Sequence, residues 1–215
     1  MDSGAATCVV LRHDAGFPIG LQSMQRSVPP KDQLLKRSAW GIVAFVFIVG
    51  CSAFGAVGGK LALPYEGYEA DLPQGWYQAR GVTDALLLTK DGLPLQFIRI
   101  KRVSVGQELS HTKKKFTQGM SPEQAAEIEV DALRSTPEIF DFEVMESTPA
   151  TVTGRPGFRL LFGWKTKDGF RLKRVHYGFV DGKWVYRLIY QAAARHYFDK
   201  DLPTFERVRE SFRLL

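Results

Sequence analysis

The sequence predicts an α+β fold: an antiparallel sheet that ends in a three-stranded C-terminal meander, with one central helix and one C-terminal helix. Two Asp-Gly pairs, Asp168-Gly169 and Asp181-Gly182, are typical of two-residue hairpin turns. A capping-box pattern that begins at Ser121 predicts the start of the central helix. Apolar residues at helical spacing near the C-terminus predict the second helix.

The N-terminal part of the chain has the pattern of a membrane-entering segment. Residues 39–59 carry no charged side chain, and Lys36 and Arg37 stand just before them as a positive flank. The densely apolar part, residues 39–49, has the length of a signal-peptide core and is shorter than the ~20 residues that span a bilayer. We therefore expect residues 1–50 to be a leader. If translation starts at Met24, residues 1–23 are not translated.

The tetrad Ile48-Val49-Gly50-Cys51 resembles the lipobox of bacterial lipoproteins. The resemblance implies that the Cys51 sulfur receives a diacylglyceryl group, that a peptidase cuts between Gly50 and Cys51, and that the new amine is acylated. Several acyl chains anchor a protein firmly, whereas one chain binds marginally. Ser52 after the cysteine implies the periplasmic side of an outer membrane, with an inner-membrane anchor as the alternative.

A single-pass transmembrane scaffold is the second interpretation of this segment, because residues 39–59 reach the required length if a helix tilts. Small residues and glycines predict a flexible tether over residues 51–64. One folded domain is then expected over residues 65–215. Roughly 70% of its unfolded surface can be buried.

The first half of the domain reads as extended segments followed by a helix. Strands are predicted over residues 67–72, 85–89 and 95–105, with a turn at Pro73-Gln74-Gly75-Trp76. Ser121 as N-cap, Pro122 in the first turn and Gln124 at the third helical position then predict a helix that ends before Pro137.

The second half contains the meander, after a strand over residues 140–145 and a turn over residues 151–156. Two-residue Asp-Gly turns would place Trp164 opposite Lys173 and Phe179 opposite Trp184. This register puts one apolar set on a single core face: Phe158, Leu160, Phe162, Trp164, Val175, Tyr177, Phe179, Trp184, Tyr186, Leu188 and Tyr190. A helix from Asp201 onward would present Phe205, Val208 and Phe212 to the sheet.

The order of these elements, with Pro73-x-Gly75-Trp76 near the start and Ser211-Phe212-Arg213 at the end, resembles the PsbP-like α/β/α sandwich. The resemblance covers residues 65–215. A cystatin-like curved sheet with one packed helix is the alternative architecture. Members of the PsbP-like group act mainly as binding or assembly modules, so the resemblance implies interaction rather than catalysis.

The face of the meander opposite that core is the candidate site. The predicted register collects basic side chains there: Arg159, Lys165, Arg174, His176 and Arg187. Guanidinium groups bind carboxylate and phosphate in bidentate fashion, and Gly163 and Gly178 would leave room near the backbone. The expected partner is another envelope protein or a small anionic ligand. Two alternatives are a helix that covers this face with the arginines at its rim, and an enzyme that uses His176 with Arg174 and Arg187.

Composition and motifs argue against several classes of function. Residues 51–215 carry 24 basic and 20 acidic side chains, spread along the chain, so we expect no nucleic-acid partner. Cys8 and Cys51 lie in no CxxC or Cys/His pattern, which gives no support for a zinc site. The sequence has no HExxH, GxSxG, GxGxxG or P-loop pattern. We therefore expect no catalytic residue, metal or cofactor.

Overall fold

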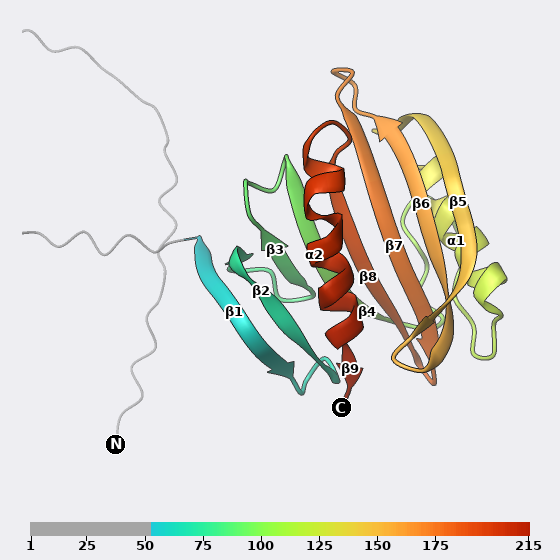
Figure 1. The fold of residues 1–215 in the computed structure, drawn as a ribbon. Helices are drawn as coiled ribbons and strands as arrows, with labels where there is room; N and C mark the ends of the chain where they lie inside the picture. Colours follow the sequence, from blue (N-terminus) through green and yellow to red (C-terminus); the bar gives the residue numbers. More distant parts are fainter. Residues whose placement is uncertain (1–52) are drawn as a thin grey trace, which may run out of the picture. The chain divides into compact units, whose positions relative to one another are not determined.

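In the part of the chain that the structure describes, nine strands form one antiparallel sheet that lies between two helices (Figure 1). The computed structural model describes residues 53–215. In chain order the elements are β1 (Phe54–Leu63), β2 (Tyr68–Ala79), β3 (Leu86–Thr89), β4 (Gln96–Ser104), α1 (Pro122–Arg134), β5 (Phe140–Val152), β6 (Arg155–Lys165), β7 (Arg171–Asp181), β8 (Trp184–Ala193), α2 (Tyr197–Ser211) and β9 (Arg213–Leu214).

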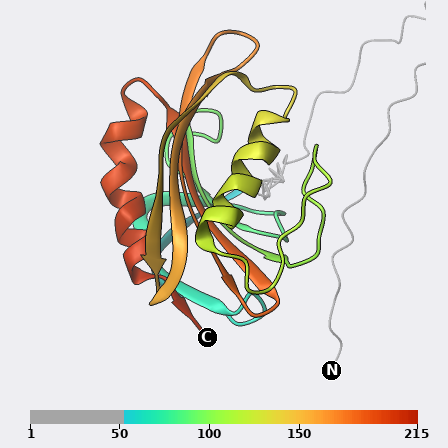
Figure 2. The ribbon, with the colours of Figure 1, turned by 90° about the vertical axis from the view of Figure 1, so that its right-hand side faces the viewer.

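The strands follow the order β1-β2-β3-β4-β8-β7-β6-β5, and β9 adds to β2. Figure 2 shows the three layers, with α2 on one face of the sheet and α1 on the other. The PsbP-like α/β/α sandwich is thereby confirmed. The cystatin-like alternative is wrong, because a helix covers each face.

Each face of the sheet has its own apolar core. The core under α2 contains Trp76, Tyr190, Phe205 and Phe212, each at most 1% exposed. The core under α1 contains Phe116 from the loop after β4, and Phe158 and Phe162 from β6. Within residues 53–215, neither helix is long and apolar enough to cross a membrane.

Helix α1 is capped as its sequence predicts. The Ser121 hydroxyl accepts a hydrogen bond from the Gln124 N–H, and the Gln124 side chain accepts one from the Ser121 N–H. Pro122 occupies the first helical position, where no N–H is needed. The helix ends at Arg134, before Pro137, which confirms both predicted boundaries.

The predicted register of the first hairpin is wrong by one residue. Trp164 lies opposite Leu172 rather than Lys173. Thr166 and Phe170 form the last bonded pair and close a three-residue loop, with Gly169 at φ +79°. This loop is one residue longer than the Asp-Gly turn that was predicted. The side chains of β6 that were expected on the common core face therefore turn to the α1 side, away from Val175, Tyr177 and Phe179 on the α2 side. They are Phe158, Leu160, Phe162 and Trp164.

In the second hairpin the observed pairing differs from the predicted pairing by two residues. Because side chains alternate with a period of two, each one stays on the face that was predicted. Phe179 lies opposite Tyr186, and Asp181 lies opposite Trp184. The turn residues are therefore Gly182 and Lys183, with glycine first at φ +56°, as in a type II′ turn. Val175, Tyr177, Phe179, Tyr186, Leu188 and Tyr190 share the α2-side core.

The flexible tether predicted over residues 51–64 is wrong from Phe54 onward. Residues Phe54–Leu63 form the edge strand β1, which pairs with β2 and packs Val57, Leu61 and Leu63 against the α2-side core. Small residues and glycines suit an edge strand with a register irregularity, which occurs here between Val57 and Gly59. The predicted turn at residues 73–76 belongs to the same irregularity within β2.

Two other boundaries differ from the prediction. Helix α2 begins at Tyr197, four residues before Asp201, because Phe198 extends its apolar stripe and stacks on Tyr190 at 5.5 Å. Strand β5 runs on to Val152, and its turn with β6 consists of Thr153 and Gly154, both at positive φ.

Candidate functional site

A set of basic side chains occupies the α1-side face of the central strands. Arg99 and Lys101 come from β4, Arg187 from β8 and Arg174 from β7. We call these four residues the cationic face. In the ladder Lys101 lies opposite Arg187, and Arg99 and His176 flank Ile189 from the two sides. Like charges on neighbouring strands repel, so the sheet alone does not stabilise this arrangement.

Two of the four cations have carboxylate partners. Arg187 donates from Nη2 to Glu129 Oε2 at 2.5 Å. Glu129 lies on α1 and is fully buried, and its other oxygen, Oε1, has no partner within residues 53–215. Lys101 Nζ lies 2.5 Å from Asp84 Oδ2 at the surface. The face is therefore only partly neutralised.

Arg174 is paired with a neutral group. Its Nε and Nη2 donate to Gln191 Oε1 at 3.1 and 2.5 Å. Its guanidinium lies 5.1 Å from the Trp164 ring centroid and 5.6 Å from that of Phe162. Burial, and then the charges of Arg99 and Arg187, lower the pKa of Arg174 to about 9, so the group is still protonated at neutral pH.

Arg99 has no hydrogen bond and no ion pair within the part of the chain that the structure describes, and its Nε is buried. Its guanidinium lies 5.8 Å from the Phe97 ring centroid. Burial lowers the pKa of Arg99, the charge of Arg187 lowers it further, and Glu129 and Asp84 oppose this at longer range. Arg99 and Arg174 are thus two half-buried cations that have no carboxylate partner among the described residues.

His176 lies beneath this face and is fully buried. Its Nδ1 is 3.8 Å from Glu129 Oε2, and neither ring nitrogen has a hydrogen bond within residues 53–215. Burial, and then the charges of Arg187, Arg174 and Arg99, hold the pKa of His176 well below 6.5, so the ring is neutral. Full burial keeps a substrate away from this imidazole, which argues against the alternative of an enzyme that uses His176 with Arg174 and Arg187.

The expected room at the two glycines is absent. A Cβ on Gly178 would lie 2.3 Å from Phe158 Cζ, because the phenyl ring already fills that space. A Cβ on Gly163 would meet Met145 and the Leu172 carbonyl at 3.2 and 3.3 Å. Both glycines therefore serve packing of the sheet rather than access for a ligand.

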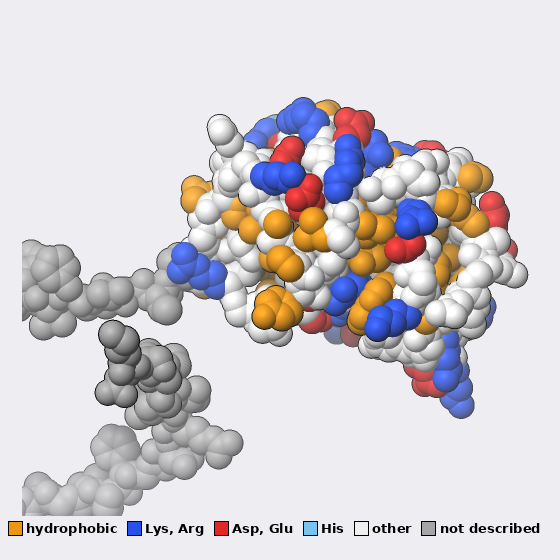
Figure 3. Space-filling model, turned by 90° about the horizontal axis from the view of Figure 1, so that it is seen from below, with side chains coloured by type: hydrophobic (Ala, Val, Ile, Leu, Met, Phe, Trp, Pro, Cys, Tyr) orange, Lys and Arg blue, Asp and Glu red, His pale blue; other side chains and the backbone are white. Residues whose placement is uncertain are grey.

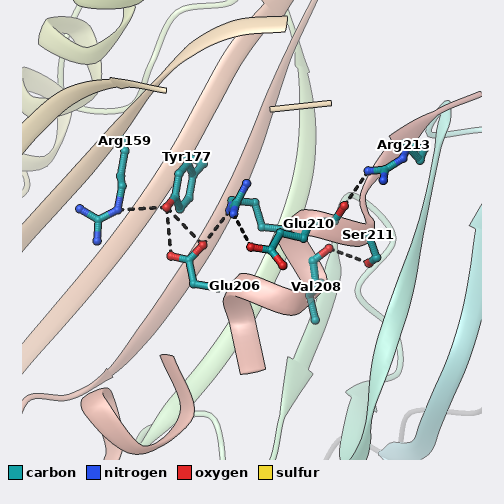
Figure 4. Close-up of polar contacts among 8 residues, drawn as sticks. Arg159, Tyr177, Glu206, Val208, Glu210, Ser211 and Arg213 are labelled. Carbon is teal, nitrogen blue, oxygen red and sulfur yellow. Dashed lines mark hydrogen bonds and ion pairs between the residues drawn. The ribbon is translucent and has the colours of Figure 1, made fainter. Parts of the chain in front are cut away.

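Arg159 and Lys165 are not part of the cationic face, because the one-residue register shift turns them to the α2 side. Figure 4 shows Arg159 donating to the Tyr177 hydroxyl, 3.0 Å, which in turn donates to Glu206 on α2. Arg159 also pairs with Glu146. Lys165 pairs with Asp141 at 2.5 Å. Both cations are neutralised within the domain.

The sequence prediction missed Arg99, Lys101 and Glu129. Arg99 and Lys101 alternate along a predicted strand, so they had to share a face. Glu129 lies three residues after Ala126 and four before Leu133, which places it on the buried stripe of α1. What the sequence lacks is the pairing of β4 with β8, which brings these residues to Arg187.

Other predicted features lie elsewhere. Gly50 and Cys51 are outside the described residues. Within residues 53–215 no group of three or more His, Cys, Asp or Glu side chains could hold a metal ion. Figure 3 shows basic and acidic side chains interspersed with apolar ones over the lower end of the domain.

The fold and the cationic face together define a class: a PsbP-like α/β/α sandwich that carries a half-buried positive sheet face. Cyanobacterial PsbP (CyanoP) from Synechocystis sp. PCC 6803 is similar in structure, with a TM-score of 0.53 and 13% identity over 78% of this chain and 95% of that one. This similarity shows the fold alone.

Two further solved structures have lower TM-scores. The Ran-binding protein Mog1p of Saccharomyces cerevisiae has a TM-score of 0.49 and 9% identity, over 74% of this chain and 96% of its own. LpqN, involved in cell envelope biogenesis of Mycobacterium tuberculosis, has a TM-score of 0.46 and 12% identity, over 75% and 90%. No protein-family model and no curated protein sequence matches the chain.

Proposed function

We propose that this protein is a lipid-anchored binding module of the bacterial cell envelope, whose domain takes up an acidic segment of a partner protein at the cationic face. The observation that carries the proposal is the pair Arg99 and Arg174, which are half-buried and charged but have no carboxylate partner within residues 53–215.

A buried cation without an anion costs free energy, and folded proteins usually pair it. Here one buried carboxylate, Glu129, serves three arginines, and the charge of Arg187 lowers the pKa of both Arg99 and Arg174. A carboxylate from outside would accept hydrogen bonds from Arg99 and relieve this repulsion. The cationic face therefore has a free-energy reason to bind an anion.

An acidic protein segment suits this face better than a small anion that is enclosed in a pocket. The four cations are spread over three strands and none is fully buried, so the anion must reach across a sheet surface. An extended chain with several Asp or Glu side chains can contact all of them. A small anion would neutralise one or two. The binding role that the PsbP-like resemblance implies agrees with this proposal.

The proposed anchor is supported by the lipobox and by where the domain starts. Strand β1 begins at Phe54, which leaves only residues 39–53 as a charge-free segment ahead of it. A helix of 15 residues rises about 22 Å, which is short of the ~30 Å hydrocarbon core. This length favours acylation at Cys51 over the transmembrane scaffold. Only two residues would then separate the lipid from β1.

Two measurements test the proposal separately. Intact mass of the protein extracted from membranes should show loss of residues 1–50 and the added mass of acyl chains, and Cys51→Ala should abolish both. An unmodified leader and thiol would contradict the anchor. For binding, photo-crosslinking in membranes should yield a partner adduct that is lost in Arg99→Gln/Arg174→Gln. The adduct should be kept in the control Arg207→Gln, which removes an exposed arginine of α2, on the other side of the sheet. Equal adducts in both variants would contradict the binding site.

A further inference from the structure

Figure 1 shows the loop between β6 and β7 and the start of α2 at the upper end of the domain. Residues from both segments line a second concave site. It has a volume of about 690 Å³, within the usual range for small-molecule sites. Its walls include Leu95, Phe170, Ala193 and Tyr197. It shares no lining residue with the cationic face.

The walls of this groove are mainly apolar. Phe170 is 44% exposed although it is a large aromatic side chain. It directly follows the three-residue loop that ends at Gly169, and its carbonyl accepts a hydrogen bond from the Thr166 N–H. The loop thus presents the ring at the groove, beside the last residues of β8. An exposed aromatic at a concave apolar surface is typical of a binding site rather than of a packed core.

Two arginines provide the charge of the groove. Arg171 and Arg195 line it, both are exposed, and neither side chain forms a hydrogen bond or ion pair within residues 53–215. Among the described residues no acidic side chain lines the groove, since Asp168, Asp199 and Asp201 all lie outside its walls. The groove therefore combines an apolar wall with an unbalanced positive charge.

The start of α2 adds to this positive potential. His196 is the N-cap of this 15-residue helix and also lines the groove, but its side chain makes no capping hydrogen bond. The N-terminal end of a helix favours negative charge. The charge that lines the groove is thus all of one sign.

We propose that this groove binds an amphipathic carboxylate, a single alkyl or acyl chain with one anionic head. The chain would lie against Phe170, Leu95 and Tyr197, and the head would accept hydrogen bonds from Arg171 and Arg195. The chemistry of the walls selects this class: apolar surface requires a hydrocarbon body, and unpaired guanidinium groups require an anion. This proposal stands independently of the acidic-segment site.

Equilibrium dialysis of radiolabelled decanoate against the full chain in phospholipid nanodiscs, with empty nanodiscs as the blank, tests the proposal. We expect saturable binding at one site. Arg171→Gln/Arg195→Gln should weaken it at least tenfold, and Ala194→Trp should weaken it by filling the groove. Arg171→Lys/Arg195→Lys should retain most of the affinity, and Arg207→Gln, on the outer face of α2, should change nothing. Decanol, which has the same chain without the charge, should bind at least tenfold more weakly.

Three results would overturn the proposal: no saturable decanoate binding to the wild type, equal affinity in the Arg171→Gln/Arg195→Gln variant, or equal affinity for decanol. Thermal unfolding of each variant keeps these outcomes interpretable. Both arginines are exposed and have no hydrogen bond or ion pair in the described domain, so their replacement should leave the unfolding midpoint unchanged.

Discussion

Glu129 on α1 and Arg187 on β8 form a 2.5 Å hydrogen-bonded ion pair that joins the helix to the middle of the sheet. Glu129 is fully buried, and only 17% of the Arg187 side chain is exposed. This pair supplies the buried negative charge for a face that carries three arginines. It therefore controls both the stability of the domain and the number of anions the face can still accept.

Replacement of Glu129 by Gln should be strongly destabilising, because it leaves Arg187 buried without a counter-charge. Loss of one partner of a buried pair costs about 3–5 kcal/mol, and the partial exposure of Arg187 points to the lower end. Chemical denaturation measures the free energy of unfolding. Glu127→Gln on the exposed side of the same helix is the control and should stay within about 0.5 kcal/mol. Equal losses in the two variants would contradict the assigned pair.

Acid should destabilise the domain through His176. Its pKa in the folded state lies well below 6.5, so below about pH 6.5 the unfolded chain binds a proton that the folded domain does not. The free energy of unfolding therefore rises with pH in this window, and falls by up to about 1.4 kcal/mol for each unit of acidification. Denaturation curves between pH 7 and pH 5 measure it.

His176→Leu should remove this contribution and flatten the curve below pH 6.5, whereas His111→Asn, in an exposed loop at positive φ, should not. If the wild type and His176→Leu show the same pH dependence, the imidazole is not buried in its neutral form.

Gly178→Ala should cost about 1–3 kcal/mol, because the added Cβ would lie 2.3 Å from the Phe158 ring. Gly58→Ala is the matched control: that Cβ meets nothing closer than 3.4 Å. Adding Phe158→Leu to Gly178→Ala should recover part of the loss if the clash with the ring is the cause. Urea denaturation of the four proteins checks this. Unchanged stability of Gly178→Ala would place Phe158 elsewhere.

Ser121→Ala should destabilise α1 by about 1 kcal/mol, since it removes the hydroxyl that accepts from the Gln124 N–H. Ser104→Ala, at an exposed strand end, is the control. If both variants lose the same free energy of unfolding, the Ser121 cap contributes nothing of its own.

Local signals in the sequence predicted the parts of the fold that depend on neighbours in the chain. The capping box at Ser121 fixes the start of α1 through groups three residues apart, and the apolar stripe of α2 places Phe205 and Phe212 against the sheet. Strand β1 was not predicted, because its small residues and glycines are typical of a linker. Its strand conformation depends on pairing with β2, which a local pattern does not show.

The candidate site was predicted in part, for a related reason. Arg174, His176 and Arg187 share a face as predicted, because a shift of two residues in the second hairpin leaves every side chain on the same side of the sheet. Arg159 and Lys165 left that face because the loop before Phe170 has three residues rather than two. Apolar patterning did not reveal this, since both faces of β6 and β7 are buried beneath helices and either register hides apolar side chains. Arg99 and Glu129 arrive from β4 and α1, through contacts distant in the chain.

The most direct test of the cationic face is fluorescence anisotropy of a labelled Glu-rich peptide titrated with the full chain in nanodiscs. The acidic-segment account predicts saturable binding that weakens at least tenfold in Arg99→Gln/Arg174→Gln, weakens with added salt, and is unchanged in Arg207→Gln. Equal affinity of the wild type and the Arg99→Gln/Arg174→Gln variant, with both proteins folded, would contradict it.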